Sequence, residues 1–164
     1  MKNTDKFLIA IVAGVVLLIG VAFAVVFLRP KPTYQTDDTP EGVAHNYLFA
    51  LQQKDYARAY SYLSPDIDGY PDSVARFTTD ISNNGYGFGS GSDSTTLEIA
   101  SSDITGDQAV VTVRETVFYN GGLFNNNQYT NTFAMTLHRE DKGWKIVSSE
   151  SYWAWCWNDT GGCQ

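Results

Sequence analysis

Residues 42–65 read GVAHNYLFALQQKDYARAYSYLSP, and this stretch decides the fold because it contains the pattern of two short consecutive helices. Asp55 interrupts the apolar pattern and is a suitable cap for a second helix, which Ser64-Pro65 ends. The apolar residues recur at helical spacing in two sets, Val43, Tyr47, Ala50 and Leu51, then Tyr56, Ala59, Tyr60 and Leu63.

Further helix signals lie on both sides of this stretch. Thr39-Pro40-Glu41 combines a cap residue, a proline in the first turn and an early acid, so it predicts the start of the first helix. Downstream, Val74, Phe77 and Ile81 predict a third, short helix that ends at Asn83-Asn84-Gly85.

The period then changes from helical to alternating. Val111, Val113 and Val117 alternate with polar residues, which gives the predicted strand one apolar face. Glycine-containing turn signals separate four β-rich stretches, Thr95–Ile104, Gln108–Asn120, Gln128–Arg139 and Trp144–Trp155. Three helices followed by an antiparallel meander predict an α+β domain with the helices packed on a curved sheet.

Two of these stretches resemble a known family. Residues 42–65 are similar to the opening helix pair of nuclear transport factor 2-like domains, and residues 141–150, DKGWKIVSSE, are similar to their last strand. The resemblance covers about residues 39–155 and implies a cone-shaped α+β fold. The family includes isomerases, dehydratases, catalytically empty ligand binders and bitopic assembly factors of secretion and conjugation machines, so the fold does not choose the function.

An apolar segment precedes the domain. Residues 7–28 contain 22 residues without a charge or a proline, enough at about 1.5 Å per residue to cross a bilayer core of about 30 Å. A cleaved signal peptide and a soluble core helix are the alternatives. We interpret residues 1–6 as a cytoplasmic tail, residues 7–28 as a transmembrane helix and residues 29–38 as a linker. The expected location is the plasma (inner) membrane, with a single span and the domain outside the cytoplasm.

The charge of the domain is strongly negative. Beyond Pro32 there are 7 Lys and Arg against 17 Asp and Glu, a difference of −10. Such a domain repels phosphate backbones, which argues against a nucleic-acid partner.

Two acids are candidates for chemistry. Strand alternation places Glu115 on the face of Val113, and it places Glu150 on the face of Ile146. A carboxylate inside the cone would have a raised pKa and could act as a general base. The competing interpretation is that one bulge turns either acid outward.

Aromatic residues are the candidates for lining a ligand pocket in the cone, although a row of tyrosines at helical spacing more often belongs to the core. These residues are Tyr47, Tyr60, Phe77, Tyr119 and Trp144. Neither His45 nor His138 has partners at a spacing typical of a triad or a zinc site, so we expect no metal and no cofactor.

The chain ends in an unusual tail, SYWAWCWNDTGGCQ, at residues 151–164. We expect the last strand to continue to about Trp155, with Trp153 and Trp155 on one face. A disulfide between Cys156 and Cys163 would then tie down residues 156–164 as a structural staple, because the Cys-x-x-Cys context of a redox pair is missing. Two cysteines in such a tail fit an oxidising compartment.

The sequence therefore predicts a membrane-anchored domain with a non-catalytic role, either binding a small apolar ligand or contacting a protein partner in a cell-envelope assembly. The alternative is a small pocket enzyme of the isomerase or dehydratase type that uses a buried glutamate as its general base.

Overall fold

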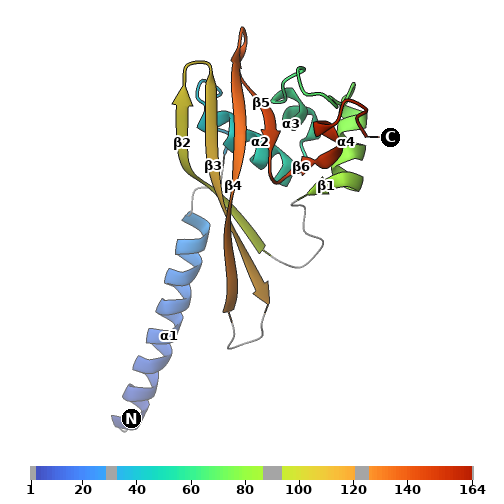
Figure 1. The fold of residues 1–164 in the computed structure, drawn as a ribbon. Coiled ribbons are helices and arrows are strands. Elements are labelled where there is room, and N and C mark those ends of the chain that lie inside the picture. The colour runs from blue at the N-terminus through green and yellow to red at the C-terminus, as the bar shows by residue number, and fades with distance from the viewer. Residues whose placement is uncertain (1–2, 29–32, 87–93, 121–125, 164) are drawn as a thin grey trace. The chain divides into compact units, whose positions relative to one another are not determined.

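The computed structural model describes residues 3–28, 33–86, 94–120 and 126–163. The chain divides into two compact units, Met1–Thr33 and Tyr34–Gln164 (Figure 1). Each unit is described separately below.

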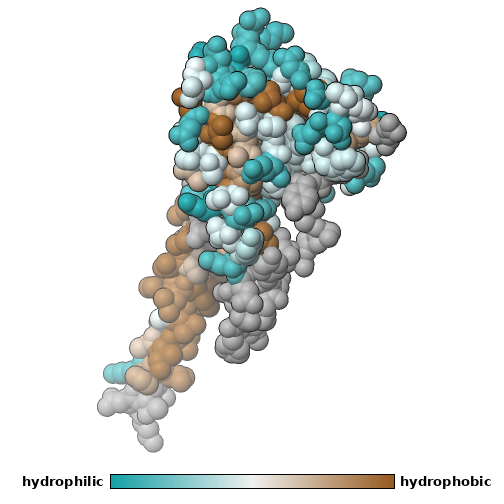
Figure 2. Space-filling view, in the orientation of Figure 1, coloured by the Kyte–Doolittle hydropathy of each residue, from teal (hydrophilic) through white to brown (hydrophobic). Residues whose placement is uncertain are grey.

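The first unit consists of helix α1 (Asn3–Leu28). Its segment Lys6–Val25 is long and apolar enough to cross a membrane, and none of it is buried by protein. Figure 2 shows an almost continuous apolar surface along this helix, in contrast to the mostly hydrophilic visible face of the second unit. Length and composition thus allow one membrane span.

The second unit begins with three helices, α2 (Pro40–Gln52), α3 (Tyr56–Ser61) and α4 (Val74–Asn84). The expected caps form, because the Thr39 side chain accepts a hydrogen bond from the amide of Gly42 and the Asp55 side chain accepts one from the amide of Arg58. Helix α3 is shorter than its apolar period suggests. Leu63 leaves it to form a parallel bridge with Ile146 at the edge of the sheet.

The main sheet contains four antiparallel strands in the order β2 (Ser94–Thr105), β3 (Gln108–Asn120), β4 (Asn126–Glu140) and β5 (Gly143–Ser149). The β2–β3 and β4–β5 turns contain Gly106 and Gly143, both at positive φ, which glycine adopts without a steric penalty. As expected, the sheet is a meander with one face against the helices (Figure 1). The α+β fold predicted from the sequence is therefore confirmed.

The predicted extent of the last strand, Trp144–Trp155, is wrong. Strand β5 ends at Ser149, and the chain then turns into a separate strand, β6 (Trp153–Ala154), which pairs with β1 (Gly85–Tyr86). A short 3-10 helix, η1 (Trp155–Asn158), follows. The break occurs at Tyr152, whose φ is +57°. Because residues 150–152 form a bend rather than a strand, alternation no longer predicts which side chains share a face.

The core lies between the helices and the inner face of the sheet. Strands β3, β4 and β5 supply fully buried apolar side chains in alternation, as a sheet with one covered face requires. These are Val111, Val113, Met135, Leu137 and Ile146, and the helices meet them with Val43, Tyr47 and Phe77.

Residues 34–38, which the sequence assigns to the linker, belong to the compact unit instead. The buried Asn46 side chain accepts a hydrogen bond from the Gln35 amide at 2.7 Å and donates one to the Gln35 carbonyl at 2.8 Å. It also donates to the Asp37 carboxylate at 2.6 Å. A Cβ on Gly42 would lie 2.0 Å from the Thr36 carbonyl oxygen, so only glycine admits this close approach. Tight packing against α2 makes this segment part of the domain.

Candidate functional site

The residues predicted to line a ligand pocket are mostly part of the core. Tyr47 and Phe77 have no exposed surface, and Trp144 retains 7%. Tyr60 is half-buried, and the side chain of Tyr119 lies outside the described part of the chain. The space expected for a ligand beside Tyr47 and Phe77 is therefore occupied by the protein's own side chains.

Glu115 is the one sequence-predicted acid that lies on the inner face of the sheet. It continues the row of Val111 and Val113 on β3, as alternation predicts, and its side chain is partly exposed. Its Oε1 atom accepts a hydrogen bond from the Tyr152 hydroxyl at 2.6 Å. Burial, followed by this bond and the charge of Glu115, raises the pKa of Tyr152, so the phenol stays protonated and acts as the donor.

Tyr152 is the functional candidate that sequence reasoning missed. Its φ of +57° is unusual for a bulky residue and costs on the order of 1–3 kcal/mol. Three contacts offset this cost: the bond to Glu115, a hydrogen bond from the Tyr47 hydroxyl to the Tyr152 carbonyl at 2.7 Å, and packing of its ring 5.7 Å from that of Phe133. The local sequence does not predict this conformation, because the contacts that stabilise it come from α2, β3 and β4, which are distant in the chain.

Glu150, the second candidate acid, does not face the interior. Strand β5 contains a bulge, since Ile146 pairs with Leu137 whereas Ser148 pairs with Thr136, which leaves Val147 as the extra residue. The bulge reverses the faces beyond it, and Glu150 is exposed. Its carboxylate accepts a hydrogen bond from the Ala134 amide at 2.8 Å. The placement of Glu150 beside Ile146 was therefore wrong.

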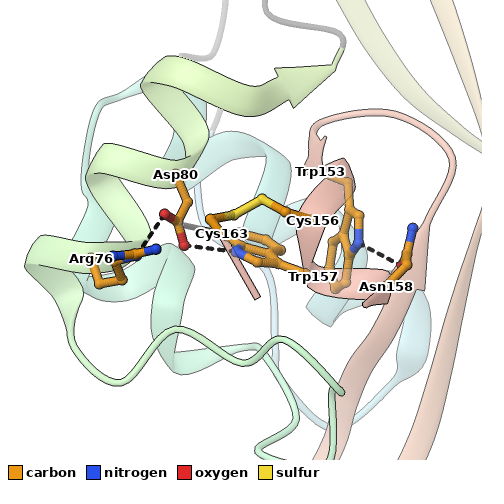
Figure 3. Close-up of a disulfide and its surroundings, with 7 residues drawn as sticks. All are labelled: Arg76, Asp80, Trp153, Cys156, Trp157, Asn158 and Cys163. Atoms are coloured by element: carbon orange, nitrogen blue, oxygen red, sulfur yellow. Dashed lines mark hydrogen bonds and ion pairs between the residues drawn. A yellow bond between two sulfur atoms is a disulfide. The ribbon is translucent and has the colours of Figure 1, made fainter. Parts of the chain in front are cut away.

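The C-terminal tail packs against α4, as Figure 3 shows. The Trp157 indole donates to the buried Asp80 carboxylate at 3.0 Å, and Arg76 forms an ion pair with the other carboxylate oxygen at 2.9 Å. The Trp157 ring stacks on Phe77 at 5.3 Å and meets Trp153 edge-on at 4.8 Å. This cluster closes the end of the core.

The expected disulfide forms between Cys156 and Cys163, with the Cα atoms 5.0 Å apart. The loop that the disulfide closes contacts Gly69, whose amide donates a hydrogen bond to the Trp157 carbonyl at 2.9 Å. The expectation that Trp153 and Trp155 share a face was wrong, because Trp155 is 62% exposed whereas Trp153 is buried. The disulfide thus holds a plug formed by Trp153 and Trp157.

No group of three or more potential metal ligands occurs among the residues that the structure describes. His45 lies beside Phe49 with its ring parallel to that side chain, at 6.0 Å. His138 lies on β4 opposite Lys145.

A separate open cleft of about 560 Å³ lies on the outside of the domain, between α3 with its following segment and the β4–β5 turn. Tyr60, one of the predicted pocket residues, lines this cleft, and its ring also packs 5.8 Å from that of the buried Phe77. Charged side chains of both signs share it with two tyrosines.

No protein-family model matches the sequence, and no curated protein is similar to it. Solved structures with a similar arrangement include a proposed calcium/calmodulin-dependent protein kinase type II association domain from Thiobacillus denitrificans, at 14% identity over 73% of this chain and 95% of that one, with a TM-score of 0.48. A proposed ketosteroid isomerase from Shewanella frigidimarina is 18% identical over 68% and 94%, with a TM-score of 0.45. A proposed dehydratase of the nuclear transport factor 2-like family from Streptomyces avermitilis is 19% identical over 65% and 87%, with a TM-score of 0.42. Likenesses this distant carry no argument about function.

Proposed function

We propose that the protein is a single-pass membrane protein whose domain acts outside the cytoplasm as a non-catalytic interaction module, within an assembly of the cell envelope. The observation that carries this proposal is the burial of Tyr47, Phe77 and Trp144, since no water-sized space adjoins the side chains of Tyr47 and Phe77. The aromatic residues expected to line a reaction pocket form the core, and the disulfide-tied tail closes one end of it.

Two further features support the proposal. Helix α1 supplies a candidate anchor, and the disulfide suits an oxidising compartment outside the cytoplasm. Large aromatic side chains are exposed where an interaction partner can reach them, namely Phe118 at 42%, Tyr129 at 56% and Trp155 at 62%. A partner protein of the envelope is therefore a better fit than a small apolar ligand.

A protease experiment on spheroplasts tests the topology. Protease added outside should digest the domain and leave a cytoplasmic control protein intact. Protection of the domain until lysis would contradict an extracytoplasmic location, and release of a soluble form beginning near Val25 would contradict the anchor.

The alternative function is a pocket enzyme with Glu115 as its general base, and one observation favours it. Tyr152, whose φ is positive, holds its hydroxyl 2.6 Å from the Oε1 atom of Glu115. A phenol that can donate a proton thus lies beside a carboxylate that can accept one. Against it, Glu115 already has this partner and lies at a partly exposed position.

Two conservative variants separate the two functions. In a strain whose deletion phenotype is complemented by the parent gene, Glu115→Gln and Tyr152→Phe should both complement if the domain is an interaction module. Loss of complementation by Glu115→Gln, with the melting temperature unchanged, would support the enzyme. Glu150→Gln, which changes the same charge at an exposed position, is the matched control.

A further inference from the structure

The C-terminal tail contains an Asn-x-Thr sequence, Asn158-Asp159-Thr160, inside the loop that the disulfide closes. This pattern is the acceptor of N-linked sugars on proteins that act outside the cytoplasm, provided that the middle residue is not proline. All three residues are exposed, although Asn158 lies only two positions beyond the buried Cys156. A pattern this short also occurs by chance, so the surrounding structure has to support it.

The Asn158 side chain uses only one of its two polar atoms within the described part of the chain. Its Oδ1 atom accepts a hydrogen bond from the Trp153 indole at 3.2 Å. Figure 3 shows the amide nitrogen of Asn158 on the side that faces away from Trp153. An N-linked sugar is attached to this nitrogen and leaves the oxygen able to accept. The bond to Trp153 is therefore compatible with the modification.

An exposed indole lies next to Asn158 on the surface of the tail. Trp155 and Asn158 are the first and last residues of η1, a 3-10 helix, in which side chains three positions apart eclipse one another. Trp155 is 62% exposed, whereas the other three tryptophans of the chain are buried. A sugar on Asn158 therefore has an uncovered apolar ring beside it to pack against.

From the exposed acceptor sequence, the unused amide nitrogen and the adjacent indole, we propose that Asn158 is an N-glycosylation site whose first sugar covers Trp155. The sugar donor is a lipid-linked oligosaccharide diphosphate. The Asn158 nitrogen forms a bond to the anomeric carbon and loses one proton to solvent. The bond from that carbon to the phosphate oxygen breaks, and its electron pair leaves with the lipid diphosphate.

Glycosylation at Asn158 rests on the extracytoplasmic location in the proposed function, and it goes beyond that function by adding a covalent modification. It covers Trp155 but leaves Phe118 and Tyr129 exposed, so these two side chains remain available to a protein partner.

Peptide mapping of the full chain purified from its native host tests the site. The peptide that contains Asn158 should carry the mass of a sugar chain, and enzymatic release of that chain should convert Asn158 to aspartate. Thr160→Ala keeps Asn158 but removes the acceptor pattern, so it should abolish the added mass, whereas Thr160→Ser should retain it. An unmodified parental peptide, or a sugar that persists in Thr160→Ala, would overturn the inference.

Tryptophan fluorescence tests whether the sugar covers Trp155. Acrylamide quenches exposed indoles, and Trp155 is the exposed one of the four. The quenching constant of the parental protein should be at most half that of Thr160→Ala, and the difference should disappear when both proteins carry Trp155→Phe. Equal quenching of the parental protein and Thr160→Ala would show that the sugar does not cover the indole.

The spheroplast experiment separates the failure of this site from the failure of the proposed function. If external protease digests the domain while Asn158 is unmodified, only the glycosylation site is refuted. If the domain is protected until lysis, the extracytoplasmic location is refuted, and the glycosylation site with it.

Discussion

Replacing Trp157 by phenylalanine tests whether the tail is a plug of the core. Trp157 has no exposed surface, and its indole N–H donates to Asp80 at 3.0 Å. Phenylalanine keeps a ring against Phe77 but removes this donor, so a buried carboxylate oxygen loses its partner. Arg76 still pairs with the other oxygen of Asp80, which limits the loss.

The magnitude follows from two contributions. Losing a hydrogen bond to a charged group costs about 1.5–3 kcal/mol. The smaller ring leaves a cavity that adds on the order of 1 kcal/mol. We therefore expect Trp157→Phe to lower the free energy of unfolding by about 3 kcal/mol. The matched control is Trp155→Phe, because this indole is 62% exposed and its replacement should cost less than about 0.5 kcal/mol.

The assay is denaturation of the full chain in nonionic detergent, followed by far-ultraviolet circular dichroism, which does not depend on tryptophan fluorescence. A double-mutant cycle with Asp80→Ala, which removes the acceptor, should give non-additivity of at least about 1 kcal/mol, since the two residues share one hydrogen bond. A loss below 0.5 kcal/mol in Trp157→Phe, or an equal loss in Trp155→Phe, would refute the reasoning. Strict additivity in the cycle would refute the role of the hydrogen bond.

Three other predictions concern stability. Replacing Cys156 and Cys163 by serine should cost about 2.5 kcal/mol, the chain-entropy value for so short a loop, and intact-mass analysis of protein from the native host should show both thiols oxidised rather than free. Burial raises the pKa of Tyr47 and Tyr152, so their contribution to stability is complete below the unfolded value near pH 10 and is lost as pH rises above it. Tyr47→Phe and Tyr152→Phe should therefore each reduce the part of the tyrosinate absorbance rise that coincides with unfolding, and a reduction of the earlier, smooth rise from the exposed tyrosines such as Tyr129 would contradict their burial. Asn46→Ala should cost about 1–3 kcal/mol and speed amide exchange at residues 34–38 more than elsewhere; uniform exchange would show that these residues are not held by Asn46.

The sequence alone determined the elements that depend on local signals. Thr39 and Asp55 cap helices because a side-chain oxygen satisfies amides within three residues, and this requires no knowledge of the rest of the fold. Alternation placed Glu115 on the inner face because β3 itself has no extra residue there: it pairs with β4 without a break, and the register shift on its other side adds the extra residue to β2. The disulfide followed from the spacing of the only two cysteines.

Tertiary structure alone decided which way the side chains between Val147 and Trp157 face. One extra residue in β5 reverses the face of Glu150, and the alternating pattern of the chain carries no mark of it. The positive φ of Tyr152 is stable only because Tyr47 and Glu115, more than thirty residues away in the sequence, hold its carbonyl and hydroxyl. In η1, which follows this bend, Trp155 is exposed and Trp157 is buried. Which of the two side chains faces α4 depends on the direction in which the bend sends the chain. Local periodicity is a property of neighbouring residues, whereas a bulge or a left-handed residue is stabilised by contacts that exist only after the chain has folded.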